Sequence, residues 1–256
     1  MKNIKKDTVI SARNLKKSFN NQDSEQVIFE NLDLDIYKGD FTVIMGSSGA
    51  GKSTLMYSLS GMDRPTKGEI TFCGKAITDL SDDKLAVFRR KNCGFVFQQI
   101  YLLEKMSLMD NVVTAGVLTS KNKKEIVKKA LELFEMVNIP KETQRKFSTQ
   151  ISGGEAQRAG IVRAVINSPE VVFADEPTGA LNSNNSDAVL DVFTKLHNNG
   201  QSIIMVTHDK KSALRGNRVI YLRDGKIYGE CDLGEYKPND SVRNEKLNSF
   251  LTEMGW

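Results

Sequence analysis

The feature that most constrains this chain is a glycine-rich segment between two regular elements. Gly46-Ser-Ser-Gly-Ala-Gly-Lys-Ser53 follows residues 40–45, which have the pattern of a short buried strand, and opens a helical pattern over residues 52–61. Such a loop turns backbone N–H groups inward, and the helix start adds the positive end of its dipole. Chance would produce Gly-x-x-x-x-Gly-Lys-Ser in roughly one chain of this size in a hundred. The segment therefore predicts a phosphate-binding loop.

The expected ligand of this loop is a nucleoside triphosphate with Mg²⁺. Lys52 would reach the β- and γ-phosphates, and the Ser53 hydroxyl would bind the metal. The residues expected to contact the nucleotide here are Gly46, Ser47, Ser48, Gly49, Ala50, Gly51, Lys52, Ser53 and Thr54.

Composition indicates a globular protein and excludes several classes. The 256 residues are 39% hydrophobic and 27% charged, which suits one large domain or a core with a small subdomain. Three widely spaced cysteines favour a reducing compartment over a disulfide framework. No run approaches the roughly 18 apolar residues of a membrane span, and residues 1–8 lack the apolar stretch of a signal peptide.

The charge pattern does not predict nucleic-acid binding. The net charge of +4 is small, and the charged residues are scattered along the chain. One basic run stands out, and we interpret it as a solvated helix face, with contact to anionic lipid headgroups as the alternative. It consists of Lys121, Lys123, Lys124, Lys128 and Lys129.

Strands and helices alternate along most of the chain. The expected strands are residues 9–15, 27–36, 68–72, 171–174 and 202–207, with a hairpin over 218–227. That hairpin would turn at Asp224-Gly225. Between residues 81 and 147 the pattern becomes helical, with an amphipathic helix over 124–137, and another helix is expected at 186–196. This alternation predicts a mainly parallel sheet covered on both faces.

Three polar residues follow two of the expected buried strands. Asp175 and Glu176 end the first, and His208 follows the second. The Asp175 carboxylate would hold the water shell of the metal, and Glu176 would polarise a water over the γ-phosphate. An acidic strand end or a lone histidine is commonplace by itself, so this prediction depends on the nearby phosphate loop.

A second glycine-containing segment lies between the phosphate loop and Asp175. Ile151-Ser-Gly-Gly-Glu-Ala-Gln-Arg158 would start a helix with small residues and free N–H groups, which is a second anion site. It resembles the signature sequence of ATP-binding cassette (ABC) proteins, usually Leu-Ser-Gly-Gly-Gln. The resemblance implies that two molecules pair head to tail, the signature of each capping the nucleotide of the other. The residues implied are Ser152, Gly153, Gly154 and Glu155. A serine-capped helix with glycines for close packing is the alternative.

Other segments also resemble the ABC family. Gly94-Phe-Val-Phe-Gln98-Gln99 resembles the glutamine loop, in which Gln98 would touch the metal and sense a membrane partner. Phe19 stands where the family places an aromatic that stacks on adenine, although a core aromatic at a strand end is the alternative. The resemblance covers roughly residues 8–230. It implies a P-loop NTPase α/β fold of the ABC type: a mostly parallel sheet core, an antiparallel β subdomain and, at about 95–165, an inserted helical subdomain. Residues 231–256 would be a C-terminal extension.

The resemblance implies an ATP-hydrolysing subunit of a bacterial ABC transporter. Glu176, His208 and Gln98 would be the catalytic residues, and Ser53, Gln98 and Asp175 would hold Mg²⁺. Its partners would be a second copy of itself and an integral-membrane permease on a separate chain, without nucleic acid. That places it at the cytoplasmic face of the cell membrane. The alternatives are a non-transport ABC ATPase acting on DNA or ribosomes, and a regulatory module that binds ATP without turnover.

Finer features resemble one branch of the family. Phe95-Val-Phe-Gln-Gln and Asp175-Glu-Pro-Thr-Gly-Ala-Leu are similar to the ATPase subunits of macrolide exporters, lipoprotein-release systems and bacitracin- or lantibiotic-resistance transporters. The end of the chain, residues 244–256, is most similar to the antimicrobial-peptide resistance group, with an amphipathic helix packed on its own domain as the alternative.

Two positions depart from the family pattern. Glu155 replaces the commoner glutamine of the signature, which adds a carboxylate near a γ-phosphate. Asn182 replaces the usual aspartate in the loop that contacts the partner subunit. Asparagine keeps an acceptor and loses the charge, so we expect altered coupling between the two sites of a dimer rather than lost hydrolysis.

Overall fold

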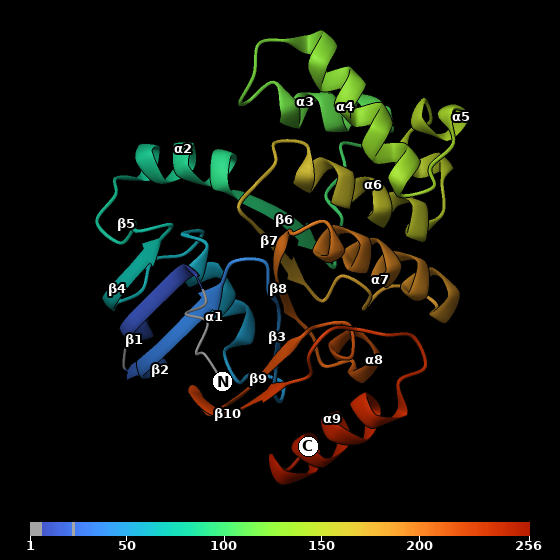
Figure 1. The fold of residues 1–256 in the computed structure, drawn as a ribbon. Coiled ribbons are helices and arrows are strands. Elements are labelled where there is room, and N and C mark those ends of the chain that lie inside the picture. Colours follow the sequence, from blue (N-terminus) through green and yellow to red (C-terminus); the bar gives the residue numbers. More distant parts are fainter. Residues whose placement is uncertain (1–6, 22–23) are drawn as a thin grey trace.

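Two β-sheets lie side by side in the computed structural model, which describes residues 7–21 and 24–256 (Figure 1). The larger sheet has the strand order β10-β9-β3-β8-β7-β6, and the smaller has the order β2-β1-β4-β5. The larger sheet contains β3 (Phe41–Met45), β6 (Cys93–Phe97), β7 (Val171–Asp175), β8 (Ser202–Val206), β9 (Arg218–Arg223) and β10 (Lys226–Asp232). The smaller sheet contains β1 (Thr8–Asn21), β2 (Ser24–Tyr37), β4 (Lys67–Phe72) and β5 (Lys75–Ala76). The signal-peptide expectation concerns residues 1–8, of which residues 1–6 lie outside the described residues.

Strand direction confirms the expected fold. In the larger sheet β9, β3, β8, β7 and β6 pair in parallel, and only β10 is antiparallel to its neighbour. The smaller sheet is antiparallel throughout. β3 and β8 are buried along their whole length because packing covers both faces of the sheet. The predicted hairpin joins β9 to β10 and turns at Asp224 and Gly225, whose φ angles of 48° and 71° allow a tight two-residue connection.

Helices cover both faces of the larger sheet. They are α1 (Lys52–Leu59), α2 (Asp82–Asn92), α3 (Leu108–Gly116), α4 (Lys123–Met136), α5 (Lys141–Gln144), α6 (Gly153–Val165), α7 (Ser183–Asn198), α8 (Lys210–Ala213) and α9 (Ser241–Glu253). Leu55 and Leu59 of α1 share a core with residues of both sheets, including Ile44 and Phe72. A second core joins the other face of the larger sheet to α3, α4, α6, α7 and α9. Among the described residues, none of the helices has the length and apolar character needed to cross a bilayer.

The helical pattern predicted between residues 81 and 147 is wrong for one segment. Cys93–Phe97 forms β6 at the edge of the larger sheet, parallel to β7, and starts directly after α2. Five residues are too few to show a period, so tertiary packing decides their structure. Gly94 marks that packing, because a Cβ there would lie 2.5 Å from the carbonyl oxygen of Ala164 in α6.

α4 confirms the amphipathic helix expected over residues 124–137. Ile126 and Phe134 are buried, whereas most of its lysines are exposed. Lys129 differs from the rest of the basic run. Its Nζ lies 2.6 Å from the Ser168 hydroxyl oxygen, and burial lowers its pKa. The solvated face therefore excludes Lys129.

The C-terminal residues form α9. This helix packs on its own domain, which is the alternative that the sequence analysis gave for residues 244–256. Leu247 and Leu251 are buried in the core that α9 shares with the larger sheet. Arg243 is 3% exposed, and burial lowers its pKa. Its guanidinium donates to the carbonyl oxygens of Leu214 and Leu233, each at 2.8 Å, and to those of Gly216, Gly234 and Glu235. This one side chain ties α9 to the end of α8.

We predict that Arg243→Met destabilises the protein. The substitution leaves several carbonyl oxygens without a donor, and we expect a loss of about 2–4 kcal/mol in the free energy of unfolding. Urea unfolding followed by circular dichroism measures it. Arg90→Met, at an exposed position of α2, is the control and should change stability by less than about 0.5 kcal/mol. Equal unfolding midpoints for the two variants would contradict the prediction.

Candidate active site

Hydrogen-bond register brings three strand ends together at one edge of the larger sheet. β8 lies between β3 and β7, and its Val206 pairs with Ile44 on one side and with Asp175 on the other. Because the three strands are parallel, the chain leaves the sheet at the same level after each of them. The glycine-rich loop, the acidic pair and His208 therefore meet at this edge.

The glycine-rich loop needs two of its glycines for space. A Cβ on Gly46 would lie 2.0 Å from a backbone carbonyl oxygen of β9. Gly51 has a φ of 92°, and a Cβ there would lie 2.7 Å from a methyl carbon of Ile28 in β2. Gly51 directly precedes α1, so the loop leads into the helix as the sequence predicted. These close approaches fix the loop against both sheets.

Lys52 folds back over this loop. Its Nζ donates to the carbonyl oxygens of Gly46 and Ser47, both at 2.8 Å. Burial lowers the pKa of Lys52, and the charges of Glu176 and Asp175 act against that effect. The ammonium group thus lies over the loop, where an oxyanion would meet it.

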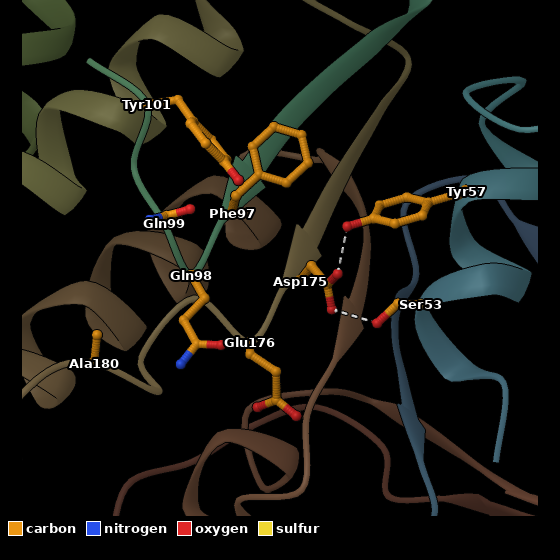
Figure 2. Close-up of a pocket in the computed structure, with 9 residues that line it drawn as sticks. All are labelled: Ser53, Tyr57, Phe97, Gln98, Gln99, Tyr101, Asp175, Glu176 and Ala180. Carbon is orange, nitrogen blue, oxygen red and sulfur yellow. Dashed lines mark hydrogen bonds between the residues drawn. The ribbon is translucent and has the colours of Figure 1, made fainter. Parts of the chain in front are cut away.

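Ser53 and Asp175 lie side by side, as expected for a metal site. The Ser53 hydroxyl donates to Oδ1 of Asp175 at 2.9 Å, and the Tyr57 hydroxyl donates to Oδ2 at 2.7 Å (Figure 2). Gln98 lines the same cavity of about 520 Å³, together with Glu176. The structure therefore brings the three predicted metal-binding residues to one cavity.

The donor set around this cavity fits Mg²⁺ that arrives with a nucleotide. Within residues 7–21 and 24–256, no cluster of three His, Cys, Asp or Glu side chains could hold a metal. The cavity instead offers the hydroxyl of Ser53, the carboxylate of Asp175 and the amide of Gln98. Mg²⁺ prefers hard oxygen ligands, keeps several waters, and is usually bound through one or two carboxylates plus substrate phosphates.

Glu176 is fixed by the end of the neighbouring strand. Its φ of 45° is unusual for a residue other than glycine and turns the chain sharply after β7. One carboxylate oxygen accepts from the Thr207 hydroxyl at 3.1 Å; the other lies 2.8 Å from Nδ1 of His208 and accepts from its backbone N–H at 3.1 Å. The two residues predicted to act together are thus in contact.

A second cavity, of about 450 Å³, lies over the glycine-rich loop. Its lining includes Ser48, Lys52, Glu176 and, from β2, Gln26. Phe19 pairs with Gln26 across the β1–β2 ladder and is 43% exposed, so it is not a core aromatic. Its position beside this cavity is compatible with stacking on a base.

The signature segment does not reach either cavity of its own molecule. Among the described residues, those that line the two cavities include none from Ser152 to Glu155. Ser152 is instead the N-cap of α6: its hydroxyl accepts from the Glu155 N–H at 3.3 Å, and its own N–H and hydroxyl donate to the Glu155 carboxylate at 2.9 and 2.8 Å. Glu155 therefore completes a capping box in the free subunit.

Asn182 also has a local role at a helix start. Its side-chain oxygen accepts from the Asn185 N–H at 3.0 Å, which makes it the N-cap of α7. An aspartate would serve this role equally well, so the cap does not explain the departure from the family pattern.

Sequence reasoning missed several residues that build the site. Tyr57 could have been found, because it stands four residues after Ser53 and so on the same face of α1. Gln157 and Arg163 of α6 had no such signal. Gln157 donates to the carbonyl oxygen of Phe97 in the glutamine loop at 3.0 Å, and Arg163 donates to that of Ile100, directly after the loop, at 2.7 Å. The signature helix is therefore joined to the glutamine loop.

We predict that Glu155→Ala lowers the free energy of unfolding by about 0.5–2 kcal/mol at neutral pH, because α6 loses its capping box. Hydrogen bonds from Ser152 hold the pKa of Glu155 below its usual range. Because the pKa of Glu155 is lower in the folded than in the unfolded protein, its ionised form stabilises the folded state at pH values above the unfolded-state pKa. This stabilisation is lost as the pH falls through the folded-state pKa. Urea titrations from pH 7 to below pH 4 should therefore show a shrinking difference between the two proteins.

Glu155→Gln is the matched control for that experiment. Its side-chain oxygen still accepts from Ser152, so it should lose less stability than the alanine variant and show a weaker dependence on pH. A stability difference that grows on acidification would contradict the predicted sign.

Comparisons with known proteins identify the family to which this chain belongs. The ABC transporter family model matches residues 29–179. An uncharacterised ABC transporter ATP-binding protein of Methanocaldococcus jannaschii is 39% identical over 219 residues, which cover 86% of this chain and 97% of that protein. The lipoprotein-releasing system ATP-binding protein LolD of Aquifex aeolicus is 37% identical over 222 residues, with coverage of 87% and 97%.

One comparison is with a longer protein and one with a solved structure. The macrolide export ATP-binding/permease protein MacB of Chlorobaculum tepidum is 41% identical over 219 residues, so this chain spans only 33% of its length. The dimeric cassette MJ0796, solved in a post-hydrolysis state bound to ADP and Pi, is 34% identical, with a TM-score of 0.81 and coverage of 89% of this chain and 100% of that one. The chain therefore belongs to the ABC transporter family, as an ATP-binding ATPase subunit of the MacB and LolD type.

Proposed function

We propose that two copies of this chain close head to tail on ATP, hydrolyse it, and drive an integral-membrane permease on a separate chain. The position of Glu176 carries the proposal. Its side chain is only 18% exposed, it lines both cavities, and Thr207 and His208 hold it in place. A carboxylate fixed beside a phosphate loop is suited to take a proton from an attacking water.

Each part of the site has one task in this proposal. The backbone of residues 46–54 and the Lys52 ammonium bind and orient the triphosphate, and Phe19 stacks on the base. Ser53, Asp175 and Gln98 hold Mg²⁺, which when bound neutralises charge that develops on the phosphate oxygens. Glu176 activates the water. His208 orients Glu176 and, with its side chain 69% exposed, is free to face the γ-phosphate.

The second copy would supply what a single subunit lacks. Ser152, Gly153, Gly154 and Glu155 line neither nucleotide cavity of their own molecule. They form the start of α6, where Ser152 and Gly153 are exposed, and a helix start is suited to an anion. In a head-to-tail pair they cap the nucleotide of the partner. The dimeric state of the 34% identical MJ0796 cassette supports this pairing.

The permease partner follows from the family and from one surface. Tyr101 and Leu103 lie in the segment that continues the glutamine loop beyond Gln99. They are 63% and 54% exposed, which offers apolar contact area close to the metal-binding residues. We propose that this loop meets the permease at the cytoplasmic face of the membrane. Arg163 of α6 is bonded to this loop segment, so a movement of the loop on contact with the permease would be transmitted to the signature segment at the start of α6.

The alternatives have less support. A regulatory module would not need a glutamate held by a histidine, and Asn182 alone favours it. A non-transport ATPase has no support among the compared relatives, whose names refer to an ABC transporter, to macrolide export and to lipoprotein release. For the substrate we propose antimicrobial peptides of the bacitracin or lantibiotic class, from the resemblance of residues 244–256. Lipoprotein release and macrolide export are the alternatives that the relatives' names supply.

We predict that ATP converts Glu176→Gln from a monomer to a dimer, because blocked hydrolysis traps the closed state. Light scattering of the purified protein with and without ATP measures its mass. A Lys52→Ala/Glu176→Gln variant is the control and should stay monomeric, since its phosphate loop lacks the cation. A monomer that binds ATP yet never dimerises would count against the proposed closure of the free subunit and favour the regulatory alternative.

We predict that deleting the gene in its host lowers the minimal inhibitory concentration of bacitracin or a lantibiotic, and leaves that of macrolides unchanged. Wild-type protein should restore resistance, whereas Glu176→Gln should not, because transport needs turnover. Unchanged peptide susceptibility with altered lipoprotein localisation would support the lipoprotein-release alternative instead.

A further inference from the structure

Helix α1 presents two hydroxyl groups to one carboxylate. Ser53 and Tyr57 are four residues apart, so their side chains lie on the same face of the helix. The Ser53 hydroxyl donates to Oδ1 of Asp175 at 2.9 Å and the Tyr57 hydroxyl to Oδ2 at 2.7 Å. Figure 2 shows the two side chains reaching Asp175 from the α1 side of the cavity, each toward a different oxygen. Only one of the two, Ser53, belongs to the phosphate-loop motif.

The Tyr57 side chain is held in this position by its surroundings. Its ring packs against the core between the two sheets. Its carbonyl oxygen accepts from the backbone N–H groups of Met62 and Asp63, at 2.9 and 3.1 Å, where α1 ends. A carboxylate oxygen can only accept, so the Tyr57 hydroxyl is the donor in its bond of 2.7 Å to Asp175.

This geometry divides the two carboxylate oxygens between different tasks. Oδ2 accepts from Tyr57, which is not among the predicted metal-binding residues, whereas Oδ1 faces Ser53, the predicted metal ligand. A hydrogen bond to one oxygen restricts rotation of the carboxylate about its last side-chain torsion, which is otherwise soft. Charge-assisted O–H···O bonds of this kind are among the stronger ones in proteins.

We propose that Tyr57 is a positioning residue that holds the Asp175 carboxylate with Oδ1 directed at the metal site, and so increases the affinity of the nucleotide-loaded subunit for Mg²⁺. The inference rests on the proposed function, in which Asp175 helps to hold Mg²⁺. Tyr57 lines the same cavity, and in this proposal it acts through the Asp175 carboxylate rather than as a ligand of the metal or the nucleotide. Its loss should weaken metal binding while the phosphate loop continues to bind ATP.

Tyr57→Phe is the sharpest test, because it removes the hydroxyl and keeps the ring that packs in the core. Mn²⁺ is the probe, and its binding in the presence of the non-hydrolysable analogue AMPPNP is followed by electron paramagnetic resonance. We expect about 3- to 10-fold weaker Mn²⁺ binding and a parallel rise in the Mg²⁺ concentration that gives half-maximal ATPase activity. Metal-free affinity for a fluorescent ATP analogue should be unchanged.

Two further variants separate positioning from a general structural effect. Tyr228→Phe removes an equivalent hydroxyl at a site that is 56% exposed on β10, and should leave Mn²⁺ binding unchanged. In an Asp175→Ala background the Tyr57→Phe change should have no further effect on Mn²⁺ binding, since Tyr57 acts only through that carboxylate. An equal fold-change in both backgrounds would overturn the proposal.

The same experiment distinguishes failure of the inference from failure of the proposed function. If Asp175→Ala itself leaves Mn²⁺ binding unchanged, the proposed metal site is wrong. If Asp175→Ala weakens binding and Tyr57→Phe does not, the metal site stands and the role of Tyr57 is wrong. A lower melting temperature of Tyr57→Phe with wild-type Mn²⁺ affinity would likewise reduce Tyr57 to a structural residue.

Discussion

The hydrogen-bond register of β3, β8 and β7 is the constraint on which the site depends. It sets Ile44, Val206 and Asp175 at one level. The phosphate loop begins two residues after that level at Gly46, and Glu176 and His208 follow it by one and two residues. A slip of one residue in β8 would exchange the two faces of the strand and carry the supports of Glu176 away from it. The buried, two-sided packing of these strands prevents the slip, so the apolar core and the catalytic geometry have the same cause.

The polar groups at this edge are satisfied by one another in the free subunit. Lys52 is paired with loop carbonyls, Asp175 with two hydroxyls, and Glu176 with the end of β8. Groups that are already oriented lose little further conformational freedom when a ligand replaces their partners. The subunit can therefore present a formed site before any nucleotide arrives, and in the proposed dimer the signature segment of the partner completes it.

Sequence reasoning located the site well where local chemistry dictates position. A glycine loop between a strand and a helix, or an acid at a strand end, carries its geometry in the adjacent residues, and the structure brings Lys52, Ser53, Asp175 and Glu176 together accordingly. Sequence reasoning failed where tertiary packing determines the local structure. The strand β6 has too few residues for a periodic signal. Sequence reasoning also did not foresee that the Glu155 carboxylate accepts from the Ser152 N–H and completes a capping box in the free subunit.

The C-terminal helix places the single tryptophan of the chain where it is useful to an experimenter. The Trp256 ring meets Tyr221 edge-on, with ring centroids 6.2 Å apart. Tyr221 pairs across the sheet with Met45, the residue directly before Gly46 and the phosphate loop. One indole thus lies a single strand away from the nucleotide-binding edge. Its fluorescence therefore reports on one defined position in the fold, with no label attached and no second tryptophan to confuse the signal.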